Sequence, residues 1–184
     1  MTVLASRAQL RASFLRWALF FVSVILLLGF ASAEISGSVA DNPWFASLVK
    51  PPLYPPPVAF PVAWTILYIL MGLAAAAVAA AWGARGRTPA LIVFVLQLAL
   101  NLSWSPIFFA FHRIEGAFYI IAVMDVLVLL SVALFWRVRW QAGLLLLPYL
   151  AWLCFATYLN WEILQLNPGA DGSGYSGAVQ RVKL

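Results

Sequence analysis

The chain has 184 residues, of which 65% are hydrophobic and only 9% are charged, with a net charge of +5. This composition excludes an ordinary soluble domain and indicates an integral membrane protein. The positive charge does not indicate nucleic-acid binding, because the basic residues stand singly or in pairs between apolar runs. Paired carboxylates, glycine-rich phosphate loops and Ser/His/Asp spacings are missing, and the single cysteine (Cys154) and single histidine (His112) form no metal cluster. We therefore expect no metal and no required cofactor.

Residues 1–16 form a basic N-terminal segment that contains three arginines and no acid. The apolar segment that follows, from Trp17 to about Ile35, has about nineteen residues, which is enough to cross a bilayer core of roughly 30 Å. This segment is predicted to be a first transmembrane helix. A cleavable signal peptide is the alternative, because Ala31-Ser32-Ala33 precedes Glu34 in a pattern typical of cleavage sites, and its removal would leave four helices.

Residues 44–68 are rich in proline and aromatic side chains and contain one lysine. The clustered prolines exclude a regular helix before about Phe60 and favour a stiff, extended polyproline geometry. Pro61 suits a first helical turn, and Trp64 and Tyr68 then lie one turn apart on one face. We interpret the segment as an aromatic lid that leads into a membrane helix. The alternative is a rigid spacer or surface loop that binds nothing.

Four more apolar segments are long enough to span a bilayer. They cover about residues 60–82, 88–111, 116–136 and 141–166. Pro106 and Pro148 fall inside two of these helices, so the carbonyls of Leu102 and Leu144 lose their helical donors. We expect these carbonyls to act as hydrogen-bond acceptors that face the bundle.

The boundaries of the transmembrane domain follow from local signals. Thr88 followed by Pro89 predicts a helix start, with Thr88 as the N-cap. After Asn167 the composition changes to Gly, Ser, Asp and Pro. The sequence therefore predicts a transmembrane domain over residues 17–166 and a flexible C-terminal tail over residues 167–184.

Orientation in the membrane is predicted from the arginines. The N-terminus, the Arg85/Arg87 loop and the Arg137/Arg139 loop alternate onto one side, which carries seven basic residues and no acids. The positive-inside rule makes this side cytoplasmic and places the lid and the C-terminus outside, in a multi-pass protein of the bacterial cell membrane. Three tryptophans at the inner boundaries are interpreted as interfacial anchors. These are Trp82, Trp136 and Trp140.

Two features inside the helices concern contacts between them. Asp125 lies near the middle of the fourth helix, where a charge costs about 2.5 to 3.5 kcal/mol on insertion scales. We expect Asp125 to face the bundle, either protonated or hydrogen-bonded to a neighbouring helix. Gly72, Ala76 and Ala80 give the second helix a small-xxx-small stripe, which either packs closely within the bundle or binds a partner.

Aromatic and amide side chains recur at matching depth beneath the lid. The second helix carries two of them, the third helix two more, and the fifth helix a series at helical spacing. Together they predict a pocket, although ordinary interhelical packing accounts equally for any single one. The residues are Trp64 and Tyr68; Asn101 and Trp104; and Tyr149, Trp152, Ala156 and Asn160.

Three ordered motifs resemble those of a known family. They are Trp44...Leu48-x-Lys50-Pro51 with Pro55-Pro56 and Phe60...Trp64...Leu67-Tyr68; Asn101-x-x-Trp104-x-Pro106-Ile107-Phe108-Phe109; and Pro148-Tyr149-Leu150-x-Trp152...Leu159-Asn160. Over roughly residues 44–167 the chain resembles the TspO or translocator protein family, also called tryptophan-rich sensory proteins and peripheral benzodiazepine receptors. The resemblance implies five transmembrane helices, retention of the first helix, a cavity closed by the first loop, and binding of porphyrins and synthetic apolar drugs.

The resemblance also implies roles for individual residues. Trp64 and Trp152 match the tryptophans linked in the family to light-dependent porphyrin breakdown. Phe45 stands where a tyrosine is frequent beside Trp44. The sterol motif of animal members requires a tyrosine and a basic residue, but Trp161 and Gln165 stand at those positions, so sterol recognition by that element is not expected. The ligand-binding residues would be Trp64, Tyr68, Asn101, Trp104, Trp152 and Ala156, with Trp44, Lys50 and Pro51 in the lid.

These observations predict an all-α bundle of five transmembrane helices under a proline- and aromatic-rich lid. The expected function is that of a receptor or transporter that binds porphyrins or other flat apolar ligands for sensing or transport. One alternative is a light-dependent porphyrin-degrading enzyme, and another is a membrane scaffold. The expected partners are the tetrapyrrole or another apolar small molecule and the lipid bilayer, with a homodimer left open. His112 lies away from the pocket, so iron coordination of a haem is not implied.

Overall fold

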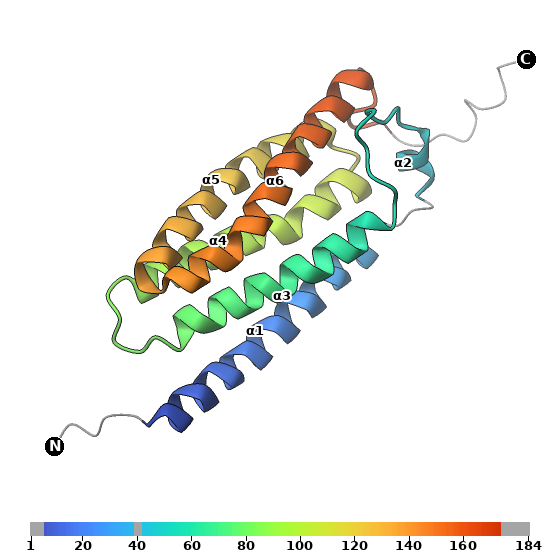
Figure 1. Cartoon of the computed structure of the whole chain (residues 1–184). Coiled ribbons are helices and arrows are strands. Elements are labelled where there is room, and N and C mark those ends of the chain that lie inside the picture. Colours follow the sequence, from blue (N-terminus) through green and yellow to red (C-terminus); the bar gives the residue numbers. More distant parts are fainter. Residues whose placement is uncertain (1–5, 39–41, 174–184) are drawn as a thin grey trace, which may run out of the picture.

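The computed structural model describes residues 6–38 and 42–173, and all regular secondary structure in this part of the chain is helical. Five helices are long and apolar enough to cross a membrane, which confirms the predicted fold class. They are α1 (Arg7–Ile35), α3 (Ala59–Ala79), α4 (Arg87–Ser105) with its continuation η1 (Pro106–Ala110), α5 (Ile114–Val138) and α6 (Trp140–Leu166). A short helix, α2 (Pro43–Ser47), lies with the following loop beyond the end of the bundle that carries the C-terminal end of α6 (Figure 1).

The helices pack in a closed order that differs from their order in the chain. α1 packs on α3, α3 on α6, α6 on α5, and α5 on α4, which returns to contact α1. We call the two ends of this bundle the lid end, which carries α2, and the arginine end, which carries the first turns of α1, the loop 80–86 and Arg139. The side of the membrane on which each end lies stays a prediction.

The contact between α1 and α3 depends on glycine. A Cβ atom added at Gly72 would lie 2.6 Å from Cγ2 of Val22, and one added at Gly29 would lie 2.3 Å from the ring of Tyr68. These distances are too short for any larger residue, so glycine lets the two helices approach closely. At Gly72 the small-residue stripe of α3 is therefore covered by α1 within the same chain, as the packing interpretation predicts.

Two helices begin at residues other than those predicted. α1 begins at Arg7 rather than Trp17, because Ser6 and Gln9 form a capping box whose side chains each bond to the other residue's backbone N–H. α4 begins at Arg87, after Gly86 in the left-handed region (φ +83°), so the prediction of Thr88 as the N-cap is wrong. The guanidinium Nε of Arg87 donates to the carbonyl of Ala79 at 2.9 Å and ties this turn to the end of α3.

The prolines inside helices have different consequences. Pro106 begins the π-helical turn η1, and the carbonyl of Leu102 that it leaves without a helical donor accepts a hydrogen bond from Ser32 Oγ of α1 at 2.6 Å. This confirms the expectation for Leu102. Pro148 lies inside α6, and Leu144, four residues earlier, is 47% exposed. The expectation that the carbonyl of Leu144 accepts a hydrogen bond within the bundle stays a prediction.

The lid is folded rather than extended. α2 is capped by Asn42, whose side-chain oxygen accepts a hydrogen bond from the backbone N–H of Phe45 at 2.9 Å. Two tight turns follow, one closed from Tyr54 to Pro51 and one from Ala59 to Pro56. The predicted extended polyproline geometry is therefore wrong over these turns, because proline also suits the second position of a β-turn.

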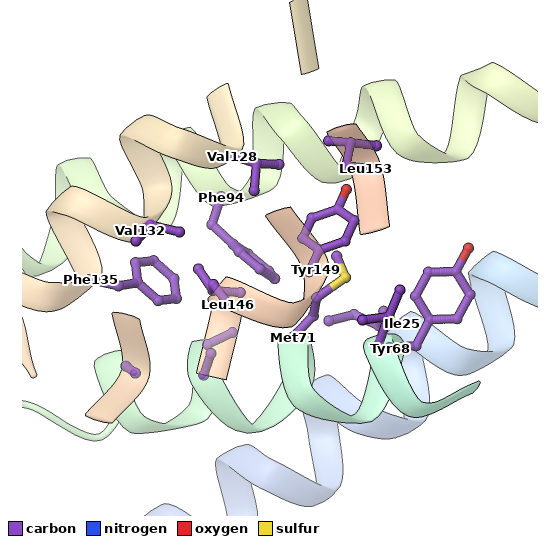
Figure 2. Packing of buried hydrophobic residues seen from close by; sticks show 14 of the residues in the cluster. Ile25, Tyr68, Met71, Phe94, Val128, Val132, Phe135, Leu146, Tyr149 and Leu153 are labelled. Atoms are coloured by element: carbon purple, nitrogen blue, oxygen red, sulfur yellow. The ribbon is translucent and has the colours of Figure 1, made fainter. Parts of the chain in front are cut away.

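The core differs between the two ends of the bundle. Towards the arginine end, Phe94 and Phe135 pack with ring centroids 5.5 Å apart beside Val132 and Leu146 (Figure 2). Small side chains of α3 fill the rest of this half, and all are buried. They are Ala74, Ala75, Ala76, Val78 and Ala79. Towards the lid end, buried tyrosines and amides replace much of this apolar packing.

Candidate ligand-binding site

Asn101 is the centre of a buried hydrogen-bond network that joins three helices. Its Nδ2 donates to the hydroxyl oxygen of Tyr149 on α6 at 3.1 Å, and its Oδ1 accepts from the hydroxyl of Tyr68 on α3 at 3.3 Å. The Tyr149 hydroxyl in turn donates to Oε1 of Gln97, one turn before Asn101 on α4, at 3.0 Å. Hydrogen bonds between membrane helices contribute about 0.6 kcal/mol each on average. The network therefore fixes the relative depth of α3, α4 and α6.

Trp104 belongs to a second cluster, closer to the lid. Its indole Nε1 donates to Oδ1 of Asn160 on α6 at 3.1 Å, and Asn160 Nδ2 donates to the carbonyl of Ile114 at 3.1 Å. The Trp104 ring also stacks on Phe108 of η1 with centroids 4.9 Å apart. The indole of Trp104 and the amide of Asn160 thus already have hydrogen-bond partners. Trp104 and Asn160 join α4, α5 and α6 next to the Asn101 network.

Trp64 and Trp152 lie on the two helices that form one seam, α3 and α6. The ring of Trp64 packs against Tyr68 at 5.3 Å and Tyr149 at 6.3 Å between centroids. The ring of Trp152 packs against Phe60 of α3 at 6.0 Å. Two aromatic pairs therefore cross the seam, and each predicted tryptophan belongs to a different one. Ala156, one turn after Trp152, is partly buried against the same core.

An apolar groove of about 380 Å³ lies along this seam. Its walls come from α3 and α6, and Trp152 lines both the groove and the aromatic pair with Phe60. The groove opens on the outer surface of the bundle, where Ile66 is 53% exposed. The lining residues are Ala63, Ile66, Leu67, Pro148, Ala151, Trp152 and Phe155. The enclosed cavity expected beneath the lid stays a prediction.

Trp44 and Lys50 hold the lid in shape. Trp44 is 3% exposed, and its ring stacks on His112 with centroids 4.3 Å apart. The ammonium of Lys50 donates to the carbonyls of Phe45, Ala46 and Leu48, which lie at the end of α2. A cation suits this position because the last carbonyls of a helix lack backbone donors. Burial lowers the pKa of Lys50 from its ordinary value.

The lid is fastened to the rest of the bundle beside Pro51, which is buried. The backbone N–H of Val49 donates to Oδ1 of Asn167 at 2.8 Å, and Asn167 Nδ2 donates back to the carbonyl of Val49 at 2.9 Å. Tyr54 packs on Phe60 at 5.2 Å, which connects the lid to the aromatic seam. Burial raises the pKa of Tyr54 to about 12.

His112 has a positive φ of 54° in the turn between η1 and α5. Its Nδ1 lies 3.0 Å from the carbonyl of Ser173, and its own carbonyl accepts from the N–H of Gly172 at 2.7 Å. Residues 167–173 thus return over this turn, and Asp171 Oδ1 accepts from the N–H of Glu115 at 2.9 Å. The remainder of the predicted tail, residues 174–184, lies outside the described residues.

Asp125 lies at the interface between α5 and α6, outside the aromatic clusters. Thr157 Oγ1 donates to its Oδ2 at 2.7 Å, which confirms the expected hydrogen bond to a neighbouring helix. Its Oδ1 is buried and has no hydrogen-bond partner within the described part of the chain. The carboxyl group therefore links two helices and lies apart from the candidate site.

The sequence interpretation missed Gln97. This side chain is 1% exposed and contacts the Tyr149 hydroxyl, while its Nε2 has no partner among the described residues. A signal was present, because Gln97 precedes Asn101 by four residues and so lies on the same helical face. A buried amide with an unused donor calls for an explanation, which makes Gln97 a candidate residue of the site.

Comparison with known proteins identifies the family of this chain. The TspO/MBR family model matches residues 18–166, which include α1 from Ala18 onwards. The tryptophan-rich protein TspO of Chlorobaculum tepidum is 39% identical over 80% of this chain and 93% of its own length. Protein CrtK of Rhodobacter capsulatus is 38% identical over 76% and 88%, and the human translocator protein is 36% identical over 70% and 78%. The chain therefore belongs to the TspO/MBR family of multi-pass membrane proteins.

Proposed function

We propose that this protein binds a porphyrin or a similar flat hydrophobic molecule at the lid end, between α3, α4 and α6. The observation that carries the proposal is the network around Asn101, which joins Tyr68 and Tyr149 at the depth where Trp64 crosses the seam. Aromatic faces stack on a planar ring system, while the amides of Asn101 and Gln97 orient its polar substituents. The names of relatives, translocator protein and tryptophan-rich sensory protein, support a role in transport or sensing.

Binding requires some of the present aromatic contacts to separate. The Trp64 to Tyr149 and Phe60 to Trp152 pairs close the seam between α3 and α6. A flat ligand inserted between these rings replaces their edge-to-face contacts with stacking on its own larger face. The stacking then offsets the loss of the edge-to-face contacts. The indole Nε1 of Trp152 is buried, has no hydrogen-bond partner among the described residues, and offers an additional donor.

A light-dependent porphyrin-degrading enzyme is the second candidate. Trp64 and Trp152 favour it, because both indoles lie at the seam where the porphyrin is proposed to bind. An excited porphyrin accepts an electron from a nearby indole, whereas phenylalanine is much harder to oxidise. The scaffold alternative has lost its main support, since α1 covers the stripe at Gly72.

The test is a titration of detergent-purified protein with protoporphyrin. In the dark, quenching of tryptophan fluorescence should saturate at a fixed ligand ratio, and its absence would contradict the proposed function. Under light, porphyrin absorbance distinguishes the two candidates. A protein-dependent loss of absorbance supports the enzyme, whereas an unchanged spectrum with saturable quenching supports the receptor or transporter.

We further propose that the arginine end is cytoplasmic in a bacterial cell membrane. In a Cys154→Ala background, a cysteine at Ser38 should react with a membrane-impermeant maleimide added outside whole cells, and one at Gly86 should not. A cysteine at Ser176, which lies outside the described residues, should also react from outside. Reaction of all three from one side would contradict the five-span topology.

A further inference from the structure

The lid end offers little open access to the aromatic seam. Trp44 is buried against His112, and Val49 is held by two hydrogen bonds to Asn167 at the end of α6. Lys50 also closes the end of α2 through three carbonyls. A ligand that enters through the lid must break this set of contacts.

The groove between α3 and α6 reaches the same seam from the side. It is lined by apolar side chains and ends at Trp152, whose ring packs on Phe60 inside the seam. The outer wall is formed by Ala151 and Ile66, which are exposed on the surface that faces the lipid in the five-span bundle. A molecule dissolved in the hydrocarbon core therefore meets Trp152 without crossing a polar surface.

The backbone of α6 is weakest at this groove. Pro148 lines it and removes one hydrogen bond from the helix, which makes bending of α6 at this point less costly. The side chains opposite, Ala63 and Leu67 on α3, are small or flexible. Separation of α3 and α6 thus requires the movement of few large groups besides the aromatic pairs themselves.

We propose that this groove is the membrane-facing docking site of the flat apolar ligand, and that the ligand enters from the bilayer between α3 and α6 rather than through the lid. The inference rests on the proposed porphyrin site and specifies how that site is reached. The choice of occupant follows from the apolar lining and from the continuity of the groove with the aromatic seam through Trp152.

The experiment measures association kinetics in lipid nanodiscs by stopped-flow quenching of tryptophan fluorescence with protoporphyrin. Ala151→Phe narrows the groove at an exposed position where folding is not at risk. It should slow association by about fivefold or more, within the range that mutations at one interface produce. Ile66→Ala widens the groove and should speed association. Ala133→Phe is the matched control, because Ala133 is also exposed but lies on α5, away from the groove.

A second arm tests the lid. Cysteines at Val49 and Asn167, joined by a short bismaleimide in the Cys154→Ala background, hold the lid closed, and at least half of the association rate should remain. A lid crosslink that abolishes association while Ala151→Phe has no effect would overturn the inference. The inference would also be overturned if Ala151→Phe changed only the lipid that copurifies with the protein and not the association rate. That result would indicate that a lipid acyl chain occupies the groove. Wild-type protein that shows no quenching at all would instead contradict the proposed function.

Discussion

The arginine-end half and the lid-end half of the bundle use different kinds of contact. In the first, Phe94 and Phe135 pack among alanines and valines that are almost completely buried. In the lid-end half, Asn101 is hydrogen-bonded to Tyr68 at 3.3 Å and to Tyr149 at 3.1 Å. Close packing of apolar groups has one good arrangement, whereas aromatic edges and amides can exchange partners. We therefore predict that the apolar core of the arginine end contributes more to stability than the network around Asn101 does.

The largest effect is expected from Phe94→Ala, which tests the first half of the comparison. Removal of a fully buried ring should destabilise the protein by about 3 kcal/mol or more, because the surrounding helices cannot close the cavity. Thermal or SDS unfolding measures this loss, and the porphyrin affinity of the folded fraction should be unchanged. Phe111→Ala is the control, since Phe111 is 67% exposed and its truncation should leave stability within about 0.5 kcal/mol.

Asn101→Leu should have a smaller effect on stability but should alter the site. It removes both hydrogen bonds to the tyrosines at nearly constant volume, at a cost of about 1 to 2 kcal/mol. Porphyrin affinity should fall as well, because the orienting amide is lost. Gln97→Leu removes a single hydrogen bond and should destabilise less. If Asn101→Leu unfolds the protein as severely as Phe94→Ala does, the two halves do not differ in this way.

Trp64→Phe and Trp152→Phe should weaken porphyrin binding by about 0.5 to 1.5 kcal/mol, because a smaller ring still stacks. Any light-driven loss of porphyrin should fall much further, since phenylalanine does not replace tryptophan in electron transfer. Fluorescence titration and absorbance under light measure the two quantities. Trp82→Phe and Trp136→Phe, at exposed positions of the arginine end, should change neither. Equal weakening by these controls would place the ligand elsewhere.

Asp125→Asn should have the smallest effect. The amide keeps a hydrogen-bond acceptor for Thr157, so folding and binding should stay close to those of the wild type, within about 0.6 kcal/mol. Thr157→Val, which removes the donor, should destabilise by a similar small amount. Loss of porphyrin binding by folded Asp125→Asn protein would give this carboxyl group a functional role.

The transmembrane helices were largely predictable because the hydropathy of a membrane span is set locally by about twenty residues. α5 and α6 begin at Ile114 and Trp140, within two residues of their predicted starts. The short helix α2 was missed, although Asn42 before Pro43 is a capping signal. Its sequence is too short for periodicity to reveal, and its stability comes from the burial of Trp44 against a distant turn.

The contacts of the predicted site residues could not be derived from the sequence, and Gln97 was missed. Helical spacing places Asn101 and Trp104 on one helix, yet the structure assigns them to two separate clusters. Spacing cannot tell which neighbour a side chain meets, since this depends on the order in which the helices pack. The groove beside Trp152 was unforeseen for the same reason, because its walls come from helices that are far apart in the sequence.

The fit of Gly29 against Tyr68 has a consequence for biogenesis. α1 and α3 are consecutive membrane spans, so this close contact can form while the rest of the chain is still being synthesised. α6 follows these spans in the chain and supplies Tyr149, which completes the bonds of Asn101. Without α6, the Nδ2 of Asn101 therefore lacks this hydrogen-bond partner. The hydrogen-bond network around Asn101 is thus complete only when α6 has joined the bundle.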